Sequence, residues 1–354
     1  MKIAIIGTVG VPASYGGFET LVENLIEDDT VCFTVYCSGQ HYSERKPVYK
    51  NAELIYIPLS ANGVQSIIYD IWSILHALFS GHKHLLILGT SGAFVLPLLR
   101  LFCPSVNIVI NIDGLEWKRQ KWKGFAKQFL KFSERLAVKF SSVVVADNAA
   151  IAKHIQSNYN AVCETIAYGG DHACVDHKEK QMVDIPFKVG GYAFALCRIE
   201  PENNVHLILE AFVNANMNLI FVGNWQASDY GCELIDRYSS IANMKLLDPI
   251  YDLDVLAMYR RNCRIYIHGH SAGGTNPSLV EMMHFEKPII AFDCVYNRAT
   301  MEDKGQYFSS SSSLSESIKT RECFEDGEEL GDIARRRYTW NVVRDQYWKL
   351  FKSK

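Results

Sequence analysis

The 354-residue sequence lacks the long apolar runs and paired cysteines that mark several specialised protein classes. No stretch reaches the ~18 uninterrupted apolar residues that a membrane-spanning helix needs. The ten cysteines are scattered without a C-x-x-C pair, which excludes a small disulfide scaffold and favours buried, reduced thiols. No secretory signal peptide is recognisable, because Met1-Lys2 leads straight into a short apolar run that ends at Gly7. We therefore expect a cytoplasmic protein.

A strong charge of either sign is also missing. The chain has 36 Lys and Arg against 39 Asp and Glu, a net charge of −3, whereas a dedicated nucleic-acid-binding domain would usually be strongly basic. Apolar residues make up 48% and charged residues 21%, which are ordinary values for a chain that buries cores and exclude a disordered tail or a collagen-like fibre. At roughly 100–200 residues per domain, the length predicts two domains.

Apolar runs of strand length alternate with helix-length patterns along the chain. Many of these runs are continuous, as expected for strands buried on both faces. In the first half, the expected strands are Ile3–Ile6, Cys32–Tyr36, Leu54–Ile57, Leu85–Leu88, Val106–Ile112 and Val143–Ala146. In the second half, they are Tyr192–Leu196, Leu219–Val222, Met244–Leu247, Arg264–Ile267 and Pro288–Ala291. This alternation predicts an α/β fold with a doubly wound parallel sheet in each half.

The domain boundary is expected in a polar, irregular stretch between the halves. We predict an N-terminal Rossmann-like domain over residues 1–172, a linker over 173–190 and a second Rossmann-like domain over 191–335. The serine run Ser309–Ser313 reads as a short flexible connection. Parallel sheets bind ligands outside the carboxyl ends of their strands, so two such domains facing each other would form a cleft closed by these loops.

The loop after the first expected strand ends in Gly16-Gly17, directly before a helical pattern. It is not the dinucleotide fingerprint G-x-G-x-x-G, because the glycine spacing is wrong and the loop is too long. Glycine amides at the start of a helix can approach an anion without hindrance from a Cβ atom. The alternative is that these glycines only turn the chain.

A second candidate loop follows Val106–Ile112 and begins with Asp113-Gly114. Asp113 could contact a ligand at the end of its strand or could cap a helix. A basic and aromatic stretch follows. It either lies on an anionic membrane surface, or packs its apolar face on the core and exposes its basic face to solvent. Its candidate contact residues are Glu116, Trp117, Lys118, Arg119, Lys121 and Trp122.

The loop Cys197–Asn204 follows the first strand of the second half. Its guanidinium, Arg198, could clamp a diphosphate with parallel hydrogen bonds, or could pair with Glu200 or Glu202 on the surface.

The loop after Arg264–Ile267 is rich in glycine and short polar residues. Its candidate ligand contacts are Gly273, Gly274, Thr275, Asn276 and Ser278. Glu281 lies about one turn inside the following helix, where its carboxylate could accept hydrogen bonds from a vicinal diol. His268 and His270 stand two residues apart without a third ligand in register, so no metal site is expected.

These segments together resemble the family-4 glycosyltransferases of the GT-B fold over nearly the whole chain. Pro12-x-x-Tyr15-Gly16-Gly17-Phe18-Glu19 is similar to the amino-terminal glycine loop of that family, and Arg198–Asn204 to its R-x-P-E-K-G loop. Ser271–Glu281 is similar to its E-x7-E segment, and residues 336–354 resemble its final helix, which crosses back to the first domain.

A narrower resemblance is to the bacterial polysaccharide rhamnosyltransferases. It rests on Asp113-Gly-Leu-Glu-Trp-Lys-Arg119, Pro201-Glu-Asn-Asn204 and His268-Gly-His-Ser-Ala-Gly-Gly-Thr-Asn-Pro-Ser278. Three positions depart from the family pattern. Asn203 replaces a lysine that contacts the donor diphosphate, Gly273 replaces the first glutamate, and Asp113 stands where many relatives have a histidine near the reaction centre.

The resemblance implies retaining transfer from a dTDP- or UDP-linked sugar, with dTDP-rhamnose favoured, to a polyprenyl-diphosphate-linked glycan in O-antigen or capsule synthesis. Arg198 and Asp113 would be catalytic, and Glu281 would hold the ribose. Gly16 and Gly17 would contact the phosphates or the acceptor, and Tyr15 would lie on the acceptor side. No metal cofactor and no nucleic-acid partner are implied, and the protein would be peripheral to the inner face of the plasma membrane. A nucleotide-sugar epimerase and a non-catalytic sugar-nucleotide-binding protein are the alternatives.

Overall fold

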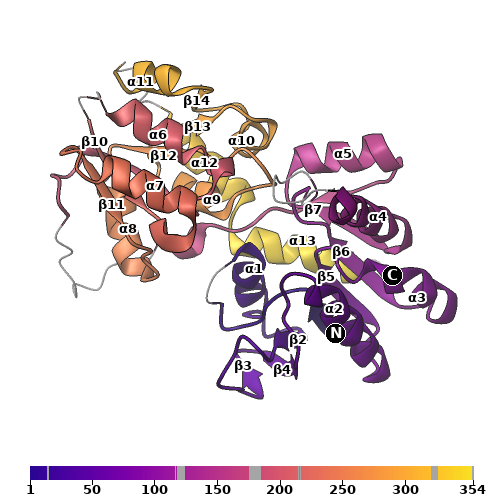
Figure 1. The fold of residues 1–354 in the computed structure, drawn as a ribbon. Helices are drawn as coiled ribbons and strands as arrows, with labels where there is room; N and C mark the ends of the chain where they lie inside the picture. Colours follow the sequence, from indigo (N-terminus) through magenta and orange to yellow (C-terminus); the bar gives the residue numbers. More distant parts are fainter. Residues whose placement is uncertain are drawn as a thin grey trace. The chain divides into compact units, whose positions relative to one another are not determined.

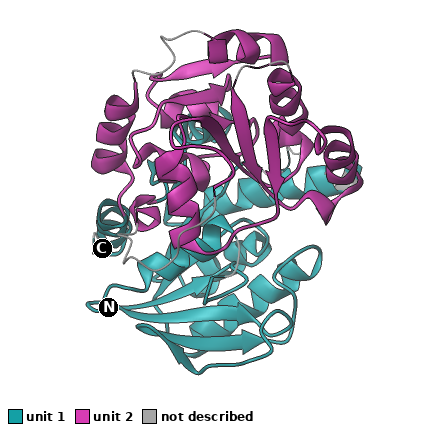
Figure 2. Ribbon diagram, turned by 90° about the vertical axis from the view of Figure 1, so that its left-hand side faces the viewer, with its two compact units in different colours: residues 1–168, 340–354 teal, residues 169–339 magenta. Residues whose placement is uncertain are grey.

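The computed structural model describes residues 1–13, 16–115, 117, 124–174, 185–213, 215, 217–319 and 326–352. The chain divides into two compact units (Figure 2). Unit 1 consists of residues 1–168 and 340–354, and unit 2 of residues 169–339. Unit 2 thus begins at residue 169, slightly before the boundary expected after residue 172. The returning segment begins at residue 340 rather than at 336.

Unit 1 is built on an eight-stranded sheet with the order β3-β4-β2-β1-β5-β6-β7-β8 (Figure 1). Its strands are β1 (Lys2–Ile6), β2 (Cys32–Ser38), β3 (Val48–Tyr49), β4 (Ala52–Ile57), β5 (His84–Leu88), β6 (Asn107–Asn111), β7 (Val143–Ala146) and β8 (Glu164–Thr165). Its helices are α1 (Gly17–Leu25), α2 (Gln65–Phe79), η1 (Ala93–Val95), α3 (Leu96–Phe102), α4 (Gly124–Phe140), α5 (Ala149–Tyr159) and α13 (Trp340–Lys352). Every strand pair is parallel except β3 with β4.

Unit 2 contains a six-stranded, wholly parallel sheet with the order β11-β10-β9-β12-β13-β14. Its strands are β9 (Tyr192–Leu196), β10 (Asn218–Val222), β11 (Met244–Leu247), β12 (Ile265–His268), β13 (Ile289–Phe292) and β14 (Gln306–Phe308). Its helices are η3 (Asp171–Ala173), η4 (Pro201–Asn203), α6 (Val205–Phe212), η5 (Trp225–Ala227), α7 (Asp229–Tyr238), α8 (Leu253–Asn262), α9 (Pro277–Met283), α10 (Val295–Thr300), α11 (Ser311–Lys319) and α12 (Gly327–Arg337).

The two parallel sheets confirm the predicted fold class. The central strands are apolar and solvent-free because helices cover both faces of such a sheet, as the continuous runs in β1 and β9 predict. The strand order reverses at β1, which lies between β2 and β5, and at β9, which lies between β10 and β12. The carboxyl ends of strands beside such a switch point are where open α/β sheets bind ligands.

The serine run Ser309–Ser313 is not a flexible connection, because helix α11 begins inside it. The Ser310 hydroxyl accepts a hydrogen bond from the Ser313 amide (3.1 Å), while the Ser313 hydroxyl accepts one from the Ser310 amide (3.1 Å). This reciprocal pair satisfies amides that a helix start leaves free, as a capping box does. Low sequence complexity therefore concealed a capping signal.

Helix α13 joins unit 1 through specific polar contacts. The Asn111 amide donates to the Tyr347 hydroxyl (2.8 Å), the Asn107 amide to the Leu350 carbonyl (3.2 Å), and the Trp348 indole to Asp28. These contacts fix the chain's last helix against β6 and against the segment that follows α1. Within the described part of the chain, no helix is both long and apolar enough to cross a membrane.

Candidate active site

In unit 2, two loops at the switch point are held together by hydrogen bonds. The Asn204 side chain donates to the Gly269 carbonyl (2.8 Å), and the Ser271 amide and hydroxyl both donate to the Glu202 carbonyl (3.0 and 2.7 Å). A Cβ atom on Gly269 would lie 2.1 Å from the Asn203 carbonyl oxygen, so only glycine permits this approach. The loop after β9 and the loop after β12 therefore form one unit, which we call the clasped loops (residues 197–204 and 269–276).

Asn203 lies inside the clasped loops. Its side-chain amide donates to the Arg198 carbonyl (2.7 Å), and its side-chain oxygen contacts His270 Nδ1 (2.9 Å). The side chain is buried, so Asn203 connects the two loops internally. The donor contact suggested by the sequence at this position stays a prediction, and the contacts seen in the structure are those with Arg198 and His270.

Arg198 is the cation at the carboxyl end of β9. Its side chain is 43% exposed, and its Nη1 lies 3.4 Å from Glu200 Oε1. This is the surface pairing that the sequence left open as an alternative. An exposed ion pair of this kind contributes little to stability, so its partner can be exchanged for a better anion at small cost.

The segment from Gly273 to Ser278 enters helix α9. Gly273 has φ +120°, a conformation that side-chain-bearing residues rarely adopt. The Asn276 side chain accepts hydrogen bonds from the Ser278 amide (3.0 Å) and hydroxyl (2.8 Å), and Pro277 occupies the first turn. Gly274 and Thr275 are buried. Asn276 and Ser278 are thus committed to capping the helix, in keeping with the preference of these residues for caps.

Glu281 forms a buried ionic cluster that sequence reasoning missed. Its Oε2 pairs with Arg260 of α8, whose side chain is only 2% exposed, and its Oε1 lies 3.5 Å from Nε2 of His172. Among the described residues, Arg260 Nη1 has no hydrogen-bond partner. Burial lowers the pKa of His172, the Arg260 charge acts in the same direction, and Glu281 opposes it. The carboxylate is therefore fixed in orientation before any ligand arrives.

The paired histidines lie at the end of β12 and in the loop that follows it. Within the described ranges, no group of three His, Cys, Asp or Glu residues is placed to hold an ion. Burial holds the pKa of His268 well below its usual value, and its Nε2 has no partner among these residues. His268 is a neutral ring between Tyr266 and His270, with centroid distances of 5.9 and 6.0 Å.

In unit 1, the loop after β1 is anchored from α1. Glu19 accepts hydrogen bonds from the Thr8 hydroxyl (2.9 Å) and the Val9 amide (2.8 Å), and Glu23 accepts one from the Ala13 amide (2.9 Å). Gly16, with φ +128°, is the N-cap of α1, and Gly17 is the first residue of that helix. The glycines thus lie at a helix start, as expected, and the acidic anchors on α1 are residues to which the sequence gave no role.

Asp113 lies just beyond β6 in a left-handed conformation, with φ +60°. Its amide donates to the Asn111 side chain (3.0 Å), which closes a tight turn after the strand. Trp117 donates its indole N–H to the buried Glu134 of α4 (2.9 Å), so this ring is attached to the helix. The other predicted residues on the acceptor side, Tyr15, Glu116, Lys118, Arg119, Lys121 and Trp122, lie outside the described residues.

Each half of the chain matches a known family model. Residues 178–322 match the family model described as glycosyl transferases group 1, and residues 1–171 match a domain of unknown function, DUF1972. No curated protein sequence matches the chain.

Solved structures match the fold over nearly the whole chain. Sucrose-phosphate synthase from Thermosynechococcus elongatus has a TM-score of 0.83 at 12% identity, covering 99% of this chain and 98% of its own. HepE from Anabaena, solved in complex with UDP, has a TM-score of 0.73 at 17% identity, with both chains fully covered. A further HepE structure, in complex with UDP-glucose, has a TM-score of 0.72 at 17% identity, again with both chains fully covered.

The fold and the group 1 match together define the class of protein. The chain is a glycosyltransferase of the GT-B fold.

Proposed function

We propose that the enzyme transfers a sugar, with retention of configuration, from a nucleoside-diphosphate donor to a lipid-linked glycan. The favoured donor is dTDP-rhamnose, with other dTDP- or UDP-linked sugars as alternatives. The acceptor would be a polyprenyl-diphosphate oligosaccharide in O-antigen or capsule synthesis. The nucleotide class is supported by HepE, whose structures contain UDP and UDP-glucose. The choice of rhamnose rests on the sequence resemblance alone.

The observation that carries this proposal is the position of Arg198 on the clasped loops at the switch point of unit 2. When the bond between sugar and phosphate breaks, negative charge accumulates on the leaving diphosphate. A guanidinium held in place beforehand stabilises that charge without reorganisation, which is the term that usually dominates such catalysis. Arg198 is half-exposed and, among the described residues, pairs with the surface carboxylate of Glu200, which it could exchange for the diphosphate.

Glu281 supplies the second element of donor binding in this proposal. Its carboxylate would accept hydrogen bonds from the two ribose hydroxyls, and the pairing with Arg260 would keep it oriented. A carboxylate has about four acceptor sites, so the pairing with Arg260 leaves capacity for a diol. The amides of Gly273 and Gly274 would add neutral donors to the phosphates, in place of the lysine that Asn203 replaces.

Unit 1 would bind the acceptor. Asp113, at the end of β6, would contact the acceptor hydroxyl or the sugar, and the β1 loop up to Gly16 and Gly17 would line the same end of the sheet. No metal cofactor and no nucleic acid take part in the proposal. A lipid-linked acceptor requires the enzyme to work at the membrane surface, so we propose that it is cytoplasmic and peripheral to the inner face of the plasma membrane.

A transfer assay tests the proposal. Purified enzyme is incubated with dTDP-rhamnose, or with UDP-glucose, and with polyprenyl-diphosphate-linked acceptors, and the lipid products are analysed by mass spectrometry. The proposal predicts an acceptor heavier by one sugar and release of the nucleoside diphosphate. Conversion of the donor in reactions without an acceptor would instead identify an epimerase. Binding of the donor with no turnover in the presence of any of the acceptors would identify a non-catalytic protein.

A further inference from the structure

Helix α2 has two apolar stripes, and only one of them faces the core. Tyr69, Ile74 and Ala77 are buried against the sheet. The opposite stripe consists of Ile68, Trp72, Leu75 and Phe79, spaced by four, three and four residues, and all four side chains are exposed. Phe79 alone is 90% exposed. A helix that is apolar all round normally has both of its faces covered, so the outer stripe of α2 lacks its partner.

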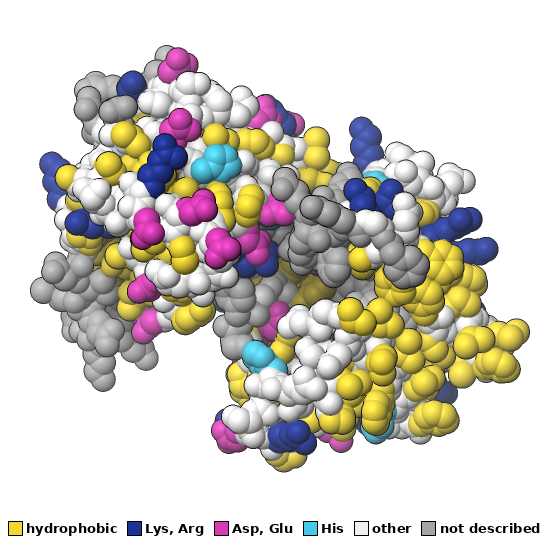
Figure 3. All heavy atoms as spheres, viewed as in Figure 1, with side chains coloured by type: hydrophobic (Ala, Val, Ile, Leu, Met, Phe, Trp, Pro, Cys, Tyr) yellow, Lys and Arg dark blue, Asp and Glu magenta, His cyan; other side chains and the backbone are white. Residues whose placement is uncertain are grey.

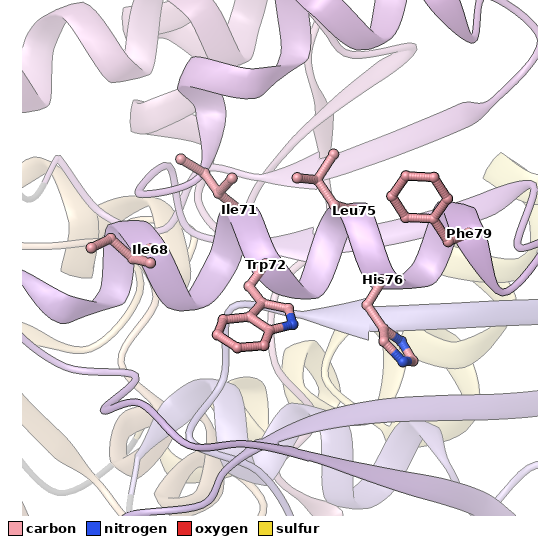
Figure 4. A pocket seen from close by; sticks show the side chains of 6 residues that line it. All are labelled: Ile68, Ile71, Trp72, Leu75, His76 and Phe79. Carbon is pink, nitrogen blue, oxygen red and sulfur yellow. The ribbon is translucent and has the colours of Figure 1, made fainter.

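The outer stripe of α2 lines a shallow groove (Figure 4). Trp72 and His76 project from one flank of the helix, and Ile71, Leu75 and Phe79 project from the other. His76 is tied to the core by a hydrogen bond with the Tyr36 hydroxyl (2.9 Å). The exposed rings of Trp72 and Phe79 therefore stand on a helix whose orientation is fixed.

Helices α3 and α4 continue this apolar surface. Gly92, just before α3, packs against Asp70 and Ile74 of α2, because a Cβ atom there would lie 2.7 Å from Asp70 Cβ. Phe94 stacks on Phe129 of α4 with ring centroids 4.9 Å apart. These contacts place η1, which leads directly into α3, against α2 and α4, and α3 itself also packs on α4 (Figure 1). We call the exposed residues they share the helical apolar face: Ile68, Trp72, Leu75, Phe79, Leu98, Leu101, Phe102 and Phe132.

Exposed apolar side chains are concentrated on the helical apolar face. Its eight members are nearly half of the seventeen large apolar side chains that are exposed within the described part of the chain. Figure 3 shows hydrophobic side chains gathered over this part of unit 1, with Lys and Arg beside them. Contiguous apolar patches of this kind mark interaction sites, whereas isolated exposed apolar residues do not.

The charge around the helical apolar face is positive. The described residues between 58 and 163 contain seven Lys and Arg and four Asp and Glu, although the whole chain has a net charge of −3. Three of these four acids, Asp70, Glu134 and Asp147, are buried. Exposed cations remain on the surface, among them Lys83, Arg135, Lys139 and Lys153. The surface seen from solution is therefore apolar with a basic surround.

We propose that the helical apolar face docks onto an anionic lipid bilayer, with its apolar side chains in the interfacial region and the cations against the headgroups. Amphipathic surfaces bind membranes through this combination of buried apolar area and attraction to anionic lipid. A second copy of the chain is the less favoured occupant, because a two-fold interface would bring two basic surrounds together. The inference rests on the proposed function, which requires work at a membrane, and it names the surface that makes contact.

This assignment places the apolar contact on other helices than the stretch singled out from the sequence. For the stretch from Glu116 into α4, the sequence left open either contact with an anionic membrane or packing of one face on the core. In the structure, Phe129 stacks on Phe94 and Trp117 is hydrogen-bonded to Glu134, so these rings pack within unit 1. Among the described aromatic side chains of α4, Phe132 is the exposed one. The basic residues of α4 remain available to headgroups, while α2 and α3 provide the apolar contact.

Vesicle flotation tests the proposal with a matched pair of variants. The test variant is Ile68→Ser/Phe79→Ser/Phe102→Ser, and the control is Val189→Ser/Tyr251→Ser/Val295→Ser, which removes exposed apolar side chains from unit 2. The vesicles are phosphatidylcholine alone or an equal mixture with phosphatidylglycerol. We expect the wild type and the control to float with the anionic vesicles, less so at high salt, and the test variant to lose about tenfold or more of its partitioning.

Three results would overturn the proposal. The test variant could float like the wild type, or the wild type could fail to bind either vesicle. Light scattering could also show a wild-type dimer that the test variant abolishes, in which case a second copy covers the face. Binding of dTDP and UDP, measured by calorimetry on the same preparations, should be unchanged in the test variant. Loss of vesicle binding with intact nucleotide binding would thus show that the membrane contact and the donor site are separate, so that each proposal can fail independently of the other.

Discussion

The two units differ in how their surfaces are used. In unit 2, polar side chains at the switch point are tied to one another, and Arg198 stands out as a half-exposed cation on the clasped loops. In unit 1, the loop after β1 is equally well anchored, but a broad apolar and basic face is left uncovered on α2 and α3. In the proposed function, unit 2 would hold the donor diphosphate, and in the proposed docking, unit 1 would contact the membrane surface. The net charge of −3 conceals this division.

The largest expected effect comes from removing the cation of unit 2. Arg198→Ala should lower the rate of sugar transfer about 10²–10³-fold, because the charge on the leaving diphosphate loses its stabilising partner. The unfolding free energy should change by less than about 0.5 kcal/mol, because the side chain is half-exposed. Arg237→Ala, on the exposed side of α7, is the control and should transfer normally. Normal transfer by the Arg198 variant would remove the catalytic role.

The buried cluster of unit 2 should respond differently. Glu281→Ala should lower the unfolding free energy by about 3–5 kcal/mol, because it leaves the buried Arg260 charge unpaired. Glu281→Gln keeps an oxygen acceptor for Arg260 and should be less destabilised, while still binding the nucleotide more weakly. Chemical denaturation and calorimetry measure the two effects, with the exposed Glu210→Ala as the control. A fully stable Glu281→Ala protein would show that the ion pair does not hold the fold.

A third variant tests whether the clasped loops tolerate the residue found in the family pattern. Asn203→Lys should lower the unfolding free energy by about 1–3 kcal/mol, because a buried amide that satisfies the Arg198 carbonyl and His270 is lost. Nucleotide affinity should not rise. Asn62→Lys, on an exposed turn of unit 1, controls for the added charge. Tighter nucleotide binding by Asn203→Lys would show instead that the position faces the donor.

A pH-dependent effect is expected at a buried acid of unit 1. Burial raises the pKa of Asp70 to about 8, against 3.8 when exposed. Between these values the folded protein binds one more proton than the unfolded chain, so the Asp70 contribution to stability is complete below about pH 4 and is lost as pH rises toward 8.

Replacing this acid should remove that pH dependence. Asp70→Asn should change the unfolding free energy little below about pH 4, where Asp70 is neutral in both the folded and the unfolded state. At pH 6 the variant should be more stable than the wild type, because only the unfolded chain ionises Asp70 there, and the decline between pH 4 and 8 should be flattened. Thermal denaturation across this range compares the two proteins. Identical pH profiles would show that Asp70 does not carry the raised pKa.

The sequence predicted the sheets well and the side-chain networks poorly, for physical reasons. Strands such as β1 and β9 are buried on both faces, so continuous apolar runs reveal them locally. Arg198 could be proposed as a ligand contact from the sequence, because it lies in the loop directly after an expected strand. The pairing of Glu281 with Arg260 and His172 joins elements far apart in the chain, and no local pattern encodes it.

Helix α2 shows a second limit of sequence reasoning. Both of its stripes are apolar, so the sequence pattern does not tell which stripe is buried. Only the three-dimensional structure shows that Ile74 is buried and that Phe79 is exposed. In the same way, the sequence of α4 allowed either a membrane-facing or a core-facing aromatic side, and the contact of Phe129 with Phe94 places that ring against its own unit.

The central claim is that the clasped loops of unit 2 bind the diphosphate of a nucleotide sugar through Arg198. Calorimetric titration of the wild type and of Arg198→Ala with dTDP, UDP and GDP tests it most directly. The account predicts saturable binding of dTDP or UDP by the wild type and binding weakened about tenfold or more in the variant, as for loss of a charge-assisted hydrogen bond. Equal affinities in the two proteins, or no binding of any of the three nucleotides, would contradict it.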